Sequence, residues 1–176
     1  MGTVRDPNRR TVLKWVAIGA TALAGGIAAG VAGARPGVTT GAQRLTLAGR
    51  SWRVLGMTRG ELPASGAQHA ITGELLGTDG QKHGEFYATS VFVGAPHGAG
   101  DSAASYVETH HFNLVDGTLV GSGTWYVSGA SRFVILAGTG RYAGATGTYE
   151  AIQRPIELGG NGTAVFNFDL TIPGGG

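Results

Sequence analysis

The stretch FVILAGTGRYAGATGTYE, residues 133–150, decides which fold this chain adopts. It begins as an apolar run of β-branched and aromatic residues, passes through four glycines between positions 138 and 147, and continues as an alternating run after Gly147. Strand-forming residues on both sides of a glycine cluster are typical of two strands joined by a sharp corner. We therefore predict a corner in a β-sheet here.

The same glycines could also begin a dinucleotide-binding loop, because Gly138 and Gly140 supply the first half of a Gly-x-Gly-x-x-Gly fingerprint. That fingerprint needs a third glycine where this chain has Ala143, and then a helix whose N-terminus faces phosphate. Residues 146–151 instead alternate like a strand. The pattern argues against a nucleotide site.

From residue 38 onward the chain has the pattern of strands separated by turns. No segment there sustains apolar residues at helical spacing for three turns, whereas alternation recurs. The chain has 33 glycines, and they cluster where turns need them. The expected fold class is all-β, with strand segments at residues 43–48, 52–57, 67–76, 84–93, 104–115, 118–127, 132–136, 144–153 and 163–172.

The last segment shows the clearest alternation, with one apolar face formed by Ala164, Phe166, Phe168, Leu170 and Ile172. Hairpin turns are expected at Asp79-Gly80 and Asp116-Gly117, which would make consecutive strands antiparallel. About eight such strands leave two exposed edges unless the sheet closes, and a closed barrel of that size holds side chains or one small ligand. The pattern alone leaves both a barrel and a two-sheet sandwich open.

Three segments carry a family resemblance. AGTGRYAGATG at 137–147 resembles the signature of the dirigent and allene oxide cyclase barrel superfamily, and GELLGTDGQKHG at 73–84 and HFNLVDGTLV at 111–120 resemble its bacterial branch. The similarity extends over residues 67–172. It implies a single antiparallel β-barrel of about eight strands, in preference to a sandwich, and a homotrimer.

The resemblance also implies a function. Members of this superfamily steer the coupling of radicals generated elsewhere, or guide the cyclisation of a reactive epoxide, so the barrel supplies shape, water exclusion and a few polar anchors. We therefore expect a protein without a cofactor that binds a small apolar or phenolic molecule and directs its cyclisation or coupling, with cyclase, isomerase-like or dirigent-type activity. The chain has no cysteine, which removes one polar group expected in the cyclase branch. A noncatalytic ligand-binding or structural barrel is the alternative.

The N-terminus has the pattern of an export signal. NRRTVLK at 8–14 places Arg9 and Arg10 before a polar residue, two apolar residues and a lysine, as in a twin-arginine signal. An apolar run follows, and a small-residue cleavage site ends at Ala34. We expect a signal-peptide helix within residues 1–34, the twin-arginine machinery as a partner, and a secreted or extracytoplasmic protein. An uncleaved membrane anchor is the alternative.

Cleavage after Ala34 would change the charge of the protein. Residues 1–34 hold four of the 13 basic and one of the 11 acidic residues, so the remaining 142 residues keep nine and ten. That part has no basic cluster, which argues against a nucleic-acid partner. Its length suits one domain, with an N-terminal segment and first strands at 35–66 and a barrel core at 67–173.

The densest polar motif is YVETHHF at 106–112. On a strand, Glu108 and His110 share one face, whereas His111 points to the other. The first two could act as acid and base, or could simply form cross-strand hydrogen bonds. Arg132, which opens a strand and could reach a cavity mouth, is the third catalytic candidate. No metal site is expected, because the other histidines do not supply a third ligand at a recognisable spacing.

Four aromatic residues are candidates for ligand binding: Tyr87, Trp125, Tyr126 and Tyr149. Each lies on an expected strand and combines an apolar ring with a hydrogen-bonding tip, which suits a pocket for a hydrophobic or phenolic molecule. The alternative is that they fill the core or a subunit interface. A shift of one residue in strand register would exchange every inward and outward position.

Overall fold

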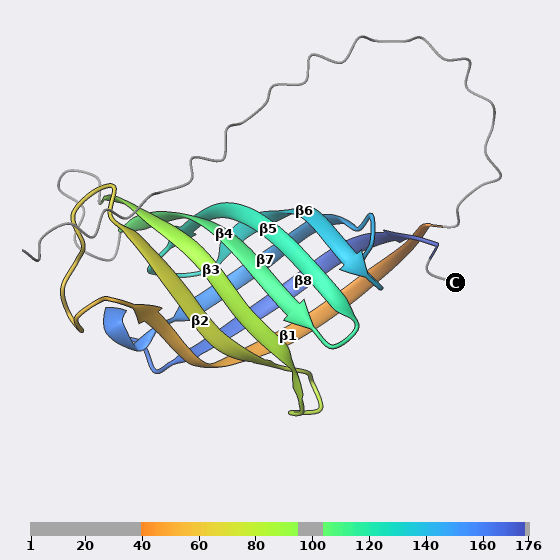
Figure 1. The fold of residues 1–176 in the computed structure, drawn as a ribbon, viewed down its shortest axis with the longest axis horizontal. Helices are drawn as coiled ribbons and strands as arrows, with labels where there is room; N and C mark the ends of the chain where they lie inside the picture. Colours follow the sequence, from red (N-terminus) through yellow and green to blue (C-terminus); the bar gives the residue numbers. More distant parts are fainter. Residues whose placement is uncertain (1–39, 95–103, 175–176) are drawn as a thin grey trace, which may run out of the picture. The chain divides into compact units, whose positions relative to one another are not determined.

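The computed structural model describes residues 40–94 and 104–174. These residues form eight antiparallel strands in which each strand pairs with the next and β8 pairs with β1, so that the sheet closes into a barrel (Figure 1). The strands are β1 Thr40–Leu55, β2 Gln68–Leu76, β3 Lys82–Gly94, β4 Ser105–Leu114, β5 Gly117–Tyr126, β6 Ser131–Gly140, β7 Thr146–Arg154 and β8 Thr163–Pro173. The predicted all-β barrel is confirmed. The predicted signal segment, with Arg9, Arg10 and Ala34, lies outside the described residues.

Strand β1 joins two segments that the sequence pattern separates. The chain bends at Ser51, which has a φ of 56°, and the pairing with β2 shifts in register between Arg50 and Arg53. The extra residue of this bulge resets the alternation, so Leu47 faces inward before the bend and Trp52 faces inward after it. Nine expected segments therefore make eight strands.

The corner predicted from the opening stretch is present between β6 and β7. Gly140 and Gly144 adopt left-handed φ values of 58° and 71°, which other residues rarely adopt. A side chain at Gly140 would also collide with the carbonyl group of Asp116. The next residue, Arg141, fixes the corner to the β4–β5 turn through a backbone hydrogen bond of 2.9 Å to the Asp116 carbonyl oxygen and an ion pair of 3.3 Å with its carboxylate.

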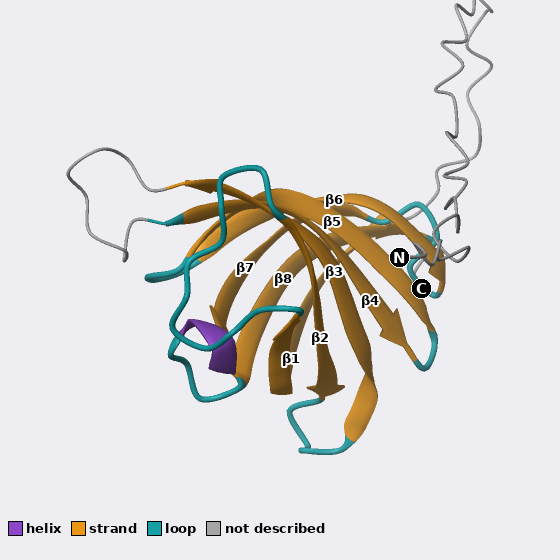
Figure 2. Ribbon diagram, turned by 60° about the vertical axis from the view of Figure 1, so that its left-hand side comes forward, coloured by secondary structure: helices purple, strands orange, loops and turns teal. Residues whose placement is uncertain are grey.

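The two ends of the barrel differ. One end, here called the loop end, carries the 56–67 connection, the 127–130 turn and the short 3-10 helix η2, Ile156–Leu158 (Figure 2). The other, the turn end, carries the turns at 77–81, 115–116 and 141–145. The β4–β5 turn consists of residues 115–116, one residue before the predicted Asp116-Gly117, because Gly117 already pairs within β5. The backbone of Gly117 lies so close to the Thr139 carbonyl group that a Cβ atom there would collide with it. In the described ranges, no helix has the length and apolar character needed to cross a membrane.

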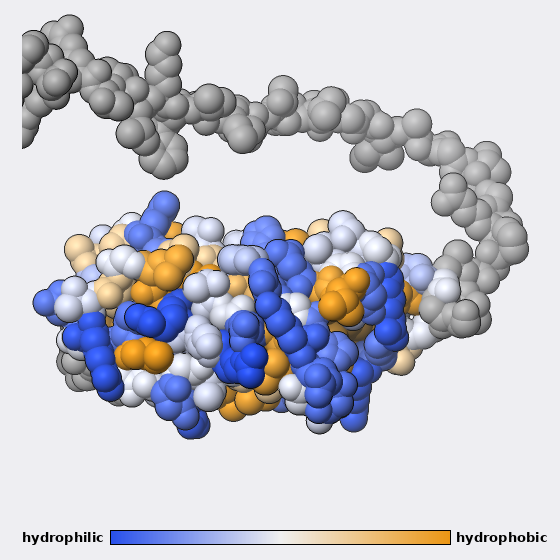
Figure 3. Space-filling model, turned by 60° about the horizontal axis from the view of Figure 1, so that its bottom comes forward, coloured by the Kyte–Doolittle hydropathy of each residue, from blue (hydrophilic) through white to orange (hydrophobic). Residues whose placement is uncertain are grey.

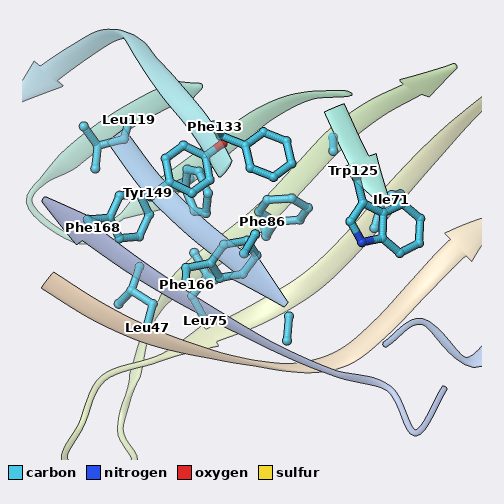
Figure 4. Close-up of a cluster of buried hydrophobic side chains, with 14 of the residues drawn as sticks. Leu47, Ile71, Leu75, Phe86, Leu119, Trp125, Phe133, Tyr149, Phe166 and Phe168 are labelled. Atoms are coloured by element: carbon cyan, nitrogen blue, oxygen red, sulfur yellow. The ribbon is translucent and has the colours of Figure 1, made fainter. Parts of the chain in front are cut away.

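The interior is filled mainly by aromatic side chains. Strand β8 buries all five residues of its predicted apolar face. Figure 4 shows Phe86, Phe133, Tyr149, Phe166 and Phe168 grouped in the middle of the barrel, with Trp125 set apart from them. The rings in this group pack at close range, with centroids 5.1 Å apart for Phe133 and Tyr149 and 4.8 Å for Tyr149 and Phe168. Such contacts stabilise the core beyond the burial of their area.

Candidate functional site

Glu108 and His110 lie side by side inside the barrel. Strand β4 turns both side chains inward, as its alternation predicts, and neither is exposed to solvent. Nε2 of His110 lies 2.7 Å from Oε2 of Glu108. The neighbouring His111 faces outward and is exposed, as predicted.

Three further side chains extend this contact into a chain of hydrogen bonds across the interior. The hydroxyl of Tyr149 on β7 lies 2.8 Å from Nδ1 of His110. Gln153, also on β7, donates from Nε2 to Oε2 of Glu108 at 2.7 Å, and Nε1 of Trp52 on β1 donates to Oε1 of Gln153 at 3.0 Å. We call these five buried side chains the interior network: Trp52, Gln153, Glu108, His110 and Tyr149.

The direction of these bonds follows from the chemistry of the groups. An indole N–H only donates, so the Gln153 carbonyl oxygen must face Trp52 and its amide nitrogen must face Glu108. With the imidazole proton on Nε2, His110 also donates to Glu108, and its Nδ1 accepts from the Tyr149 hydroxyl. One oxygen of Glu108 therefore receives two donors.

Tyr149 is held in its protonated form. Burial raises the pKa of its phenol far above the ordinary value, and the nearby Glu108 carboxylate raises it further. The hydroxyl is therefore a donor at any physiological pH. Gly121, which pairs with His110 across β4 and β5, provides the space for this ring, because a Cβ atom there would collide with it.

The second oxygen of Glu108 has no hydrogen-bond partner within residues 40–94 and 104–174. Among the described residues, five buried side-chain atoms lack a hydrogen bond, and four of them lie on inward positions of β3, β4 and β5: Ser90 Oγ, Tyr106 Oη, Glu108 Oε1 and Trp125 Nε1. We call these four the unpaired polar cluster. Each of the four side chains is at most 1% exposed. The fifth atom is Nε2 of the partly buried His69. Buried polar atoms in proteins nearly always have a partner, so ordered water or a ligand is expected to satisfy these four atoms.

Strand pairing brings the unpaired polar cluster together. Ser90 is the direct partner of Glu108 across β3 and β4, and Tyr106 is the direct partner of Trp125 across β4 and β5. The rings of Tyr106 and Trp125 lie 5.0 Å apart. Burial, together with the charge of Glu108, raises the pKa of Tyr106 to about 12.

The remaining predicted residues do not converge on this site. Tyr87 and Tyr126 face outward, 44% and 49% exposed, and the Tyr87 hydroxyl donates to Glu85 at 2.6 Å. Arg132 is also on the outer surface, where it pairs with Glu150 at 3.3 Å. Alternation explains this placement, because Trp125 turns inward and its neighbour Tyr126 must then turn outward. Of the four ligand-binding candidates, Trp125 and Tyr149 lie in the interior.

Sequence reasoning missed four residues of the site: Trp52, Ser90, Tyr106 and Gln153. Only Tyr106 had a usable signal, since it shares the inward face of the 106–112 motif with Glu108 and His110.

In the described ranges, no group of three or more metal-binding side chains forms.

A surface hollow of about 300 Å³ lies at the loop end. Its lining comes from the 56–67 connection, Val127 and the η2 region, and includes Leu62, Leu158 and Glu157. The buried Glu157 carboxylate accepts a hydrogen bond from the backbone N–H of Val54 at 2.7 Å and pairs with Arg53 at 2.5 Å. Burial works against ionisation, but these bonds outweigh it and hold the pKa of Glu157 below its usual value. They fix η2 to the end of β1.

Comparison with known proteins identifies the fold. No protein-family model and no curated protein matches the sequence. Among solved structures, the chain is similar to the pterocarpan synthase dirigent protein GePTS1, with 12% identity and a TM-score of 0.60 over 81% of this chain and 91% of that chain. It is also similar to a pyocyanin demethylase, with 16% identity and a TM-score of 0.56 over 73% of this chain and 99% of that chain. A third similar structure is the Diels-Alderase AbmU from Streptomyces koyangensis, with 16% identity and a TM-score of 0.56 over 78% of this chain and 70% of that chain. The barrel is therefore the one that dirigent proteins and cyclases share.

Proposed function

We propose that this chain binds a small apolar or phenolic molecule inside the loop-end part of its barrel and directs the cyclisation or coupling of that molecule without a cofactor. The observation that carries the proposal is the buried oxygen of Glu108 that has no partner among the residues the structure describes. The other oxygen of Glu108 accepts a hydrogen bond from Gln153 and also forms one with His110.

A purely structural role explains this arrangement poorly. Removing a carboxylate from water is expensive unless it is fully paired, and a network that served only stability would satisfy both oxygens. Here the interior network holds one oxygen of Glu108 in place, and the other has no hydrogen bond to any described residue. Such preorganisation is typical of a group that contacts a ligand.

The network also suits the proposed chemistry. A site closed to water and lined by oriented groups can hold a reactive molecule in one conformation, and this is what guided cyclisation requires. Glu108 would accept a hydrogen bond or a proton from the molecule, with His110 and Gln153 holding its other oxygen in place. The names of two fold neighbours, a pterocarpan synthase and a Diels-Alderase, support ring formation as the class of reaction.

A noncatalytic binding or structural barrel is the second candidate. It is favoured by the packing in the middle of the barrel, where Trp52, Phe86 and Phe166 lie with ring centroids 4.3 to 5.4 Å apart. Rings also pack in the loop-end part, where the centroid of Tyr106 lies 5.0 Å from those of Phe92 and Trp125. A protein of this second class would retain a molecule and release it unchanged.

The proposal includes export by the twin-arginine machinery and assembly as a homotrimer. The motif at 8–14 supports export. Exposed apolar residues on the outer surface, such as Val107, Val134 and Leu136, support contact between subunits. Figure 3 shows apolar patches between polar side chains on one face. Size-exclusion chromatography with light scattering tests the trimer, and a monomeric mass at micromolar concentration would contradict it.

Native mass spectrometry of the protein purified from its exported fraction tests the proposed function. We expect a small molecule to accompany the wild-type protein and the His111→Gln variant, whose substitution lies on the outer face of β4. The Glu108→Gln variant should lose most of it. Incubation of the recovered molecule with fresh protein then separates the two candidates, because only an enzyme changes its mass or retention. Absence of any bound molecule from all three proteins would contradict ligand binding in both candidates and leave a structural barrel.

A further inference from the structure

His69 lies between the buried carboxylate of Glu108 and the surface of the barrel. Ser90 on β3 pairs directly with His69 on β2 and with Glu108 on β4, and the alternation of each strand places all three side chains on the inward face. Each has a buried atom that forms no hydrogen bond with any described residue: His69 Nε2, Ser90 Oγ and Glu108 Oε1. We call these three residues the polar row.

The outer end of the polar row reaches a hollow. The His69 ring borders a hollow of about 130 Å³ at the loop end, whose other walls come from the 56–67 connection and include Met57, Thr58 and Pro63. His69 is partly buried, whereas Ser90 and Glu108 are closed to solvent. His69 is therefore the member of the row that meets the surface.

The geometry of the polar row suits ordered water. Side chains directly opposite each other on antiparallel strands have Cβ atoms about 4.5–5.5 Å apart. The short Ser90 side chain nevertheless bonds to neither His69 nor Glu108. A hydroxyl can both donate and accept, so one water on each side of Ser90 would satisfy all three unpaired atoms.

We infer that the polar row is a proton path between Glu108 and solvent, with ordered water between its members. A proton that leaves Glu108 Oε1 passes to the first water, which gives one of its own to Ser90 Oγ. Ser90 releases its hydroxyl proton to the second water, and that water protonates His69 Nε2. Nδ1 of His69 then gives its proton to water in the hollow. Glu108 is left as a carboxylate, His69 has changed its tautomer, and Ser90 and both waters regain their starting forms.

The other contacts of Glu108 end inside the barrel. Gln153 donates through an amide and Trp52 through an indole N–H, and neither group passes a proton on. On the other side, His110 leads to Tyr149, whose buried hydroxyl forms no further hydrogen bond among the described residues. Under the proposed function, a proton that Glu108 accepts from a bound molecule would leave by the polar row.

Proton exchange at His110 tests the path, because its Nε2–H lies against Glu108. In the full chain labelled with ¹⁵N-histidine, and without added ligand, NMR measures how fast this proton exchanges with water. The slowest backbone amides of β4 give the reference, since they exchange only when the barrel opens. We expect the His110 proton of the wild type to exchange about a hundredfold faster than these amides, a typical contribution of a positioned proton-transfer group.

Two variants interrupt the path. His69→Gln keeps a polar side chain beside the hollow but cannot relay a proton, so the His110 proton should then exchange only as fast as the reference amides. Ser90→Ala removes the hydroxyl from the middle of the row and should have the same effect. His111→Gln removes a histidine from the outer face of β4 and is the control, with exchange like the wild type. The ratio to the amide rate corrects for any change in stability.

The path fails if either His69→Gln or Ser90→Ala keeps the wild-type ratio. It also fails if the His110 proton of the wild type exchanges no faster than the amides, or if a crystal structure shows no water against Ser90. An organic molecule in place of that water would overturn the path and support the proposed function. The exchange is measured without ligand, so mass spectrometry of the exported protein judges the proposed function separately.

Discussion

The hydroxyl of Tyr149 lies 2.8 Å from Nδ1 of His110, although the two residues belong to strands that are not neighbours in the sheet. This contact joins β7 to β4 through the interior rather than through the sheet. With Gln153 and Trp52 it forms a buried path from β1 to β7 and on to β4. Substitutions along this path should therefore affect both stability and any bound ligand.

Replacement of Tyr149 by Phe should destabilise the protein. The change removes the hydroxyl and leaves Nδ1 of His110 buried without a partner, which costs about 1–3 kcal/mol. Urea unfolding followed by tryptophan fluorescence measures the change. Tyr126→Phe is the matched control, and its exposed position should keep the effect within about 0.5 kcal/mol. Equal stability of the two variants would show that the His110 contact does not hold the barrel together.

The same substitution at Tyr106 should have the opposite sign. Its hydroxyl is buried and has no partner in the described part of the chain, so removing it from the ligand-free protein should raise the free energy of unfolding by about 1 kcal/mol. The same unfolding experiment applies. If Tyr106→Phe loses stability as Tyr149→Phe does, then a bound water or ligand satisfies that hydroxyl in the wild type.

The pKa of Glu157 predicts a loss of stability in acid. Because the folded state holds its pKa below the ordinary 4.5, ionisation of Glu157 stabilises the fold above that pH, and this contribution disappears as the pH falls through the lowered value. Thermal unfolding between pH 7 and pH 3 should show a smaller acid-side decrease for Glu157→Gln than for the wild type. Glu61→Gln, a substitution of an exposed carboxylate in the same hollow, serves as the control. Parallel profiles for Glu157→Gln and the wild type would refute this role.

Replacement of Arg9 and Arg10 by lysines should block export. The twin-arginine pathway reads the arginine pair itself, so a conservative change of both residues should leave the protein in the producing cell. Immunoblots of cell and exported fractions measure this. Lys14→Arg keeps the charge and the pair, and should be exported normally. Export of the double-lysine variant at the normal level would rule out the twin-arginine route.

Alternation and turn chemistry predicted the all-β fold and part of the site, whereas the family resemblance chose a barrel over a sandwich. The period of two placed Glu108 and His110 on one face, and the glycines at 138–147 marked the corner between β6 and β7. The alternation of strand side chains also implies that Trp125 and Tyr126 cannot both line one pocket, since adjacent strand residues face opposite sides. It could not say which of them turns inward.

The remaining parts of the site depend on distant segments. Trp52 meets Gln153 across 101 residues of sequence, and Gln153 meets Glu108 across 45. The bulge at Ser51 makes Trp52 point inward, and no pattern in the sequence predicted this bulge. Strand register sets these contacts, and register follows from the closure of the whole sheet.

The pairing of β1 with β8 sets an order of events for the growing chain. The two strands align from Thr40 opposite Pro173 to Arg50 opposite Thr163. The first strand to leave the ribosome must therefore wait for the last one, with an open edge that can pair with another chain. Contacts so distant in sequence slow folding, so nascent chains that stop before residue 163 should be the species that most need a chaperone.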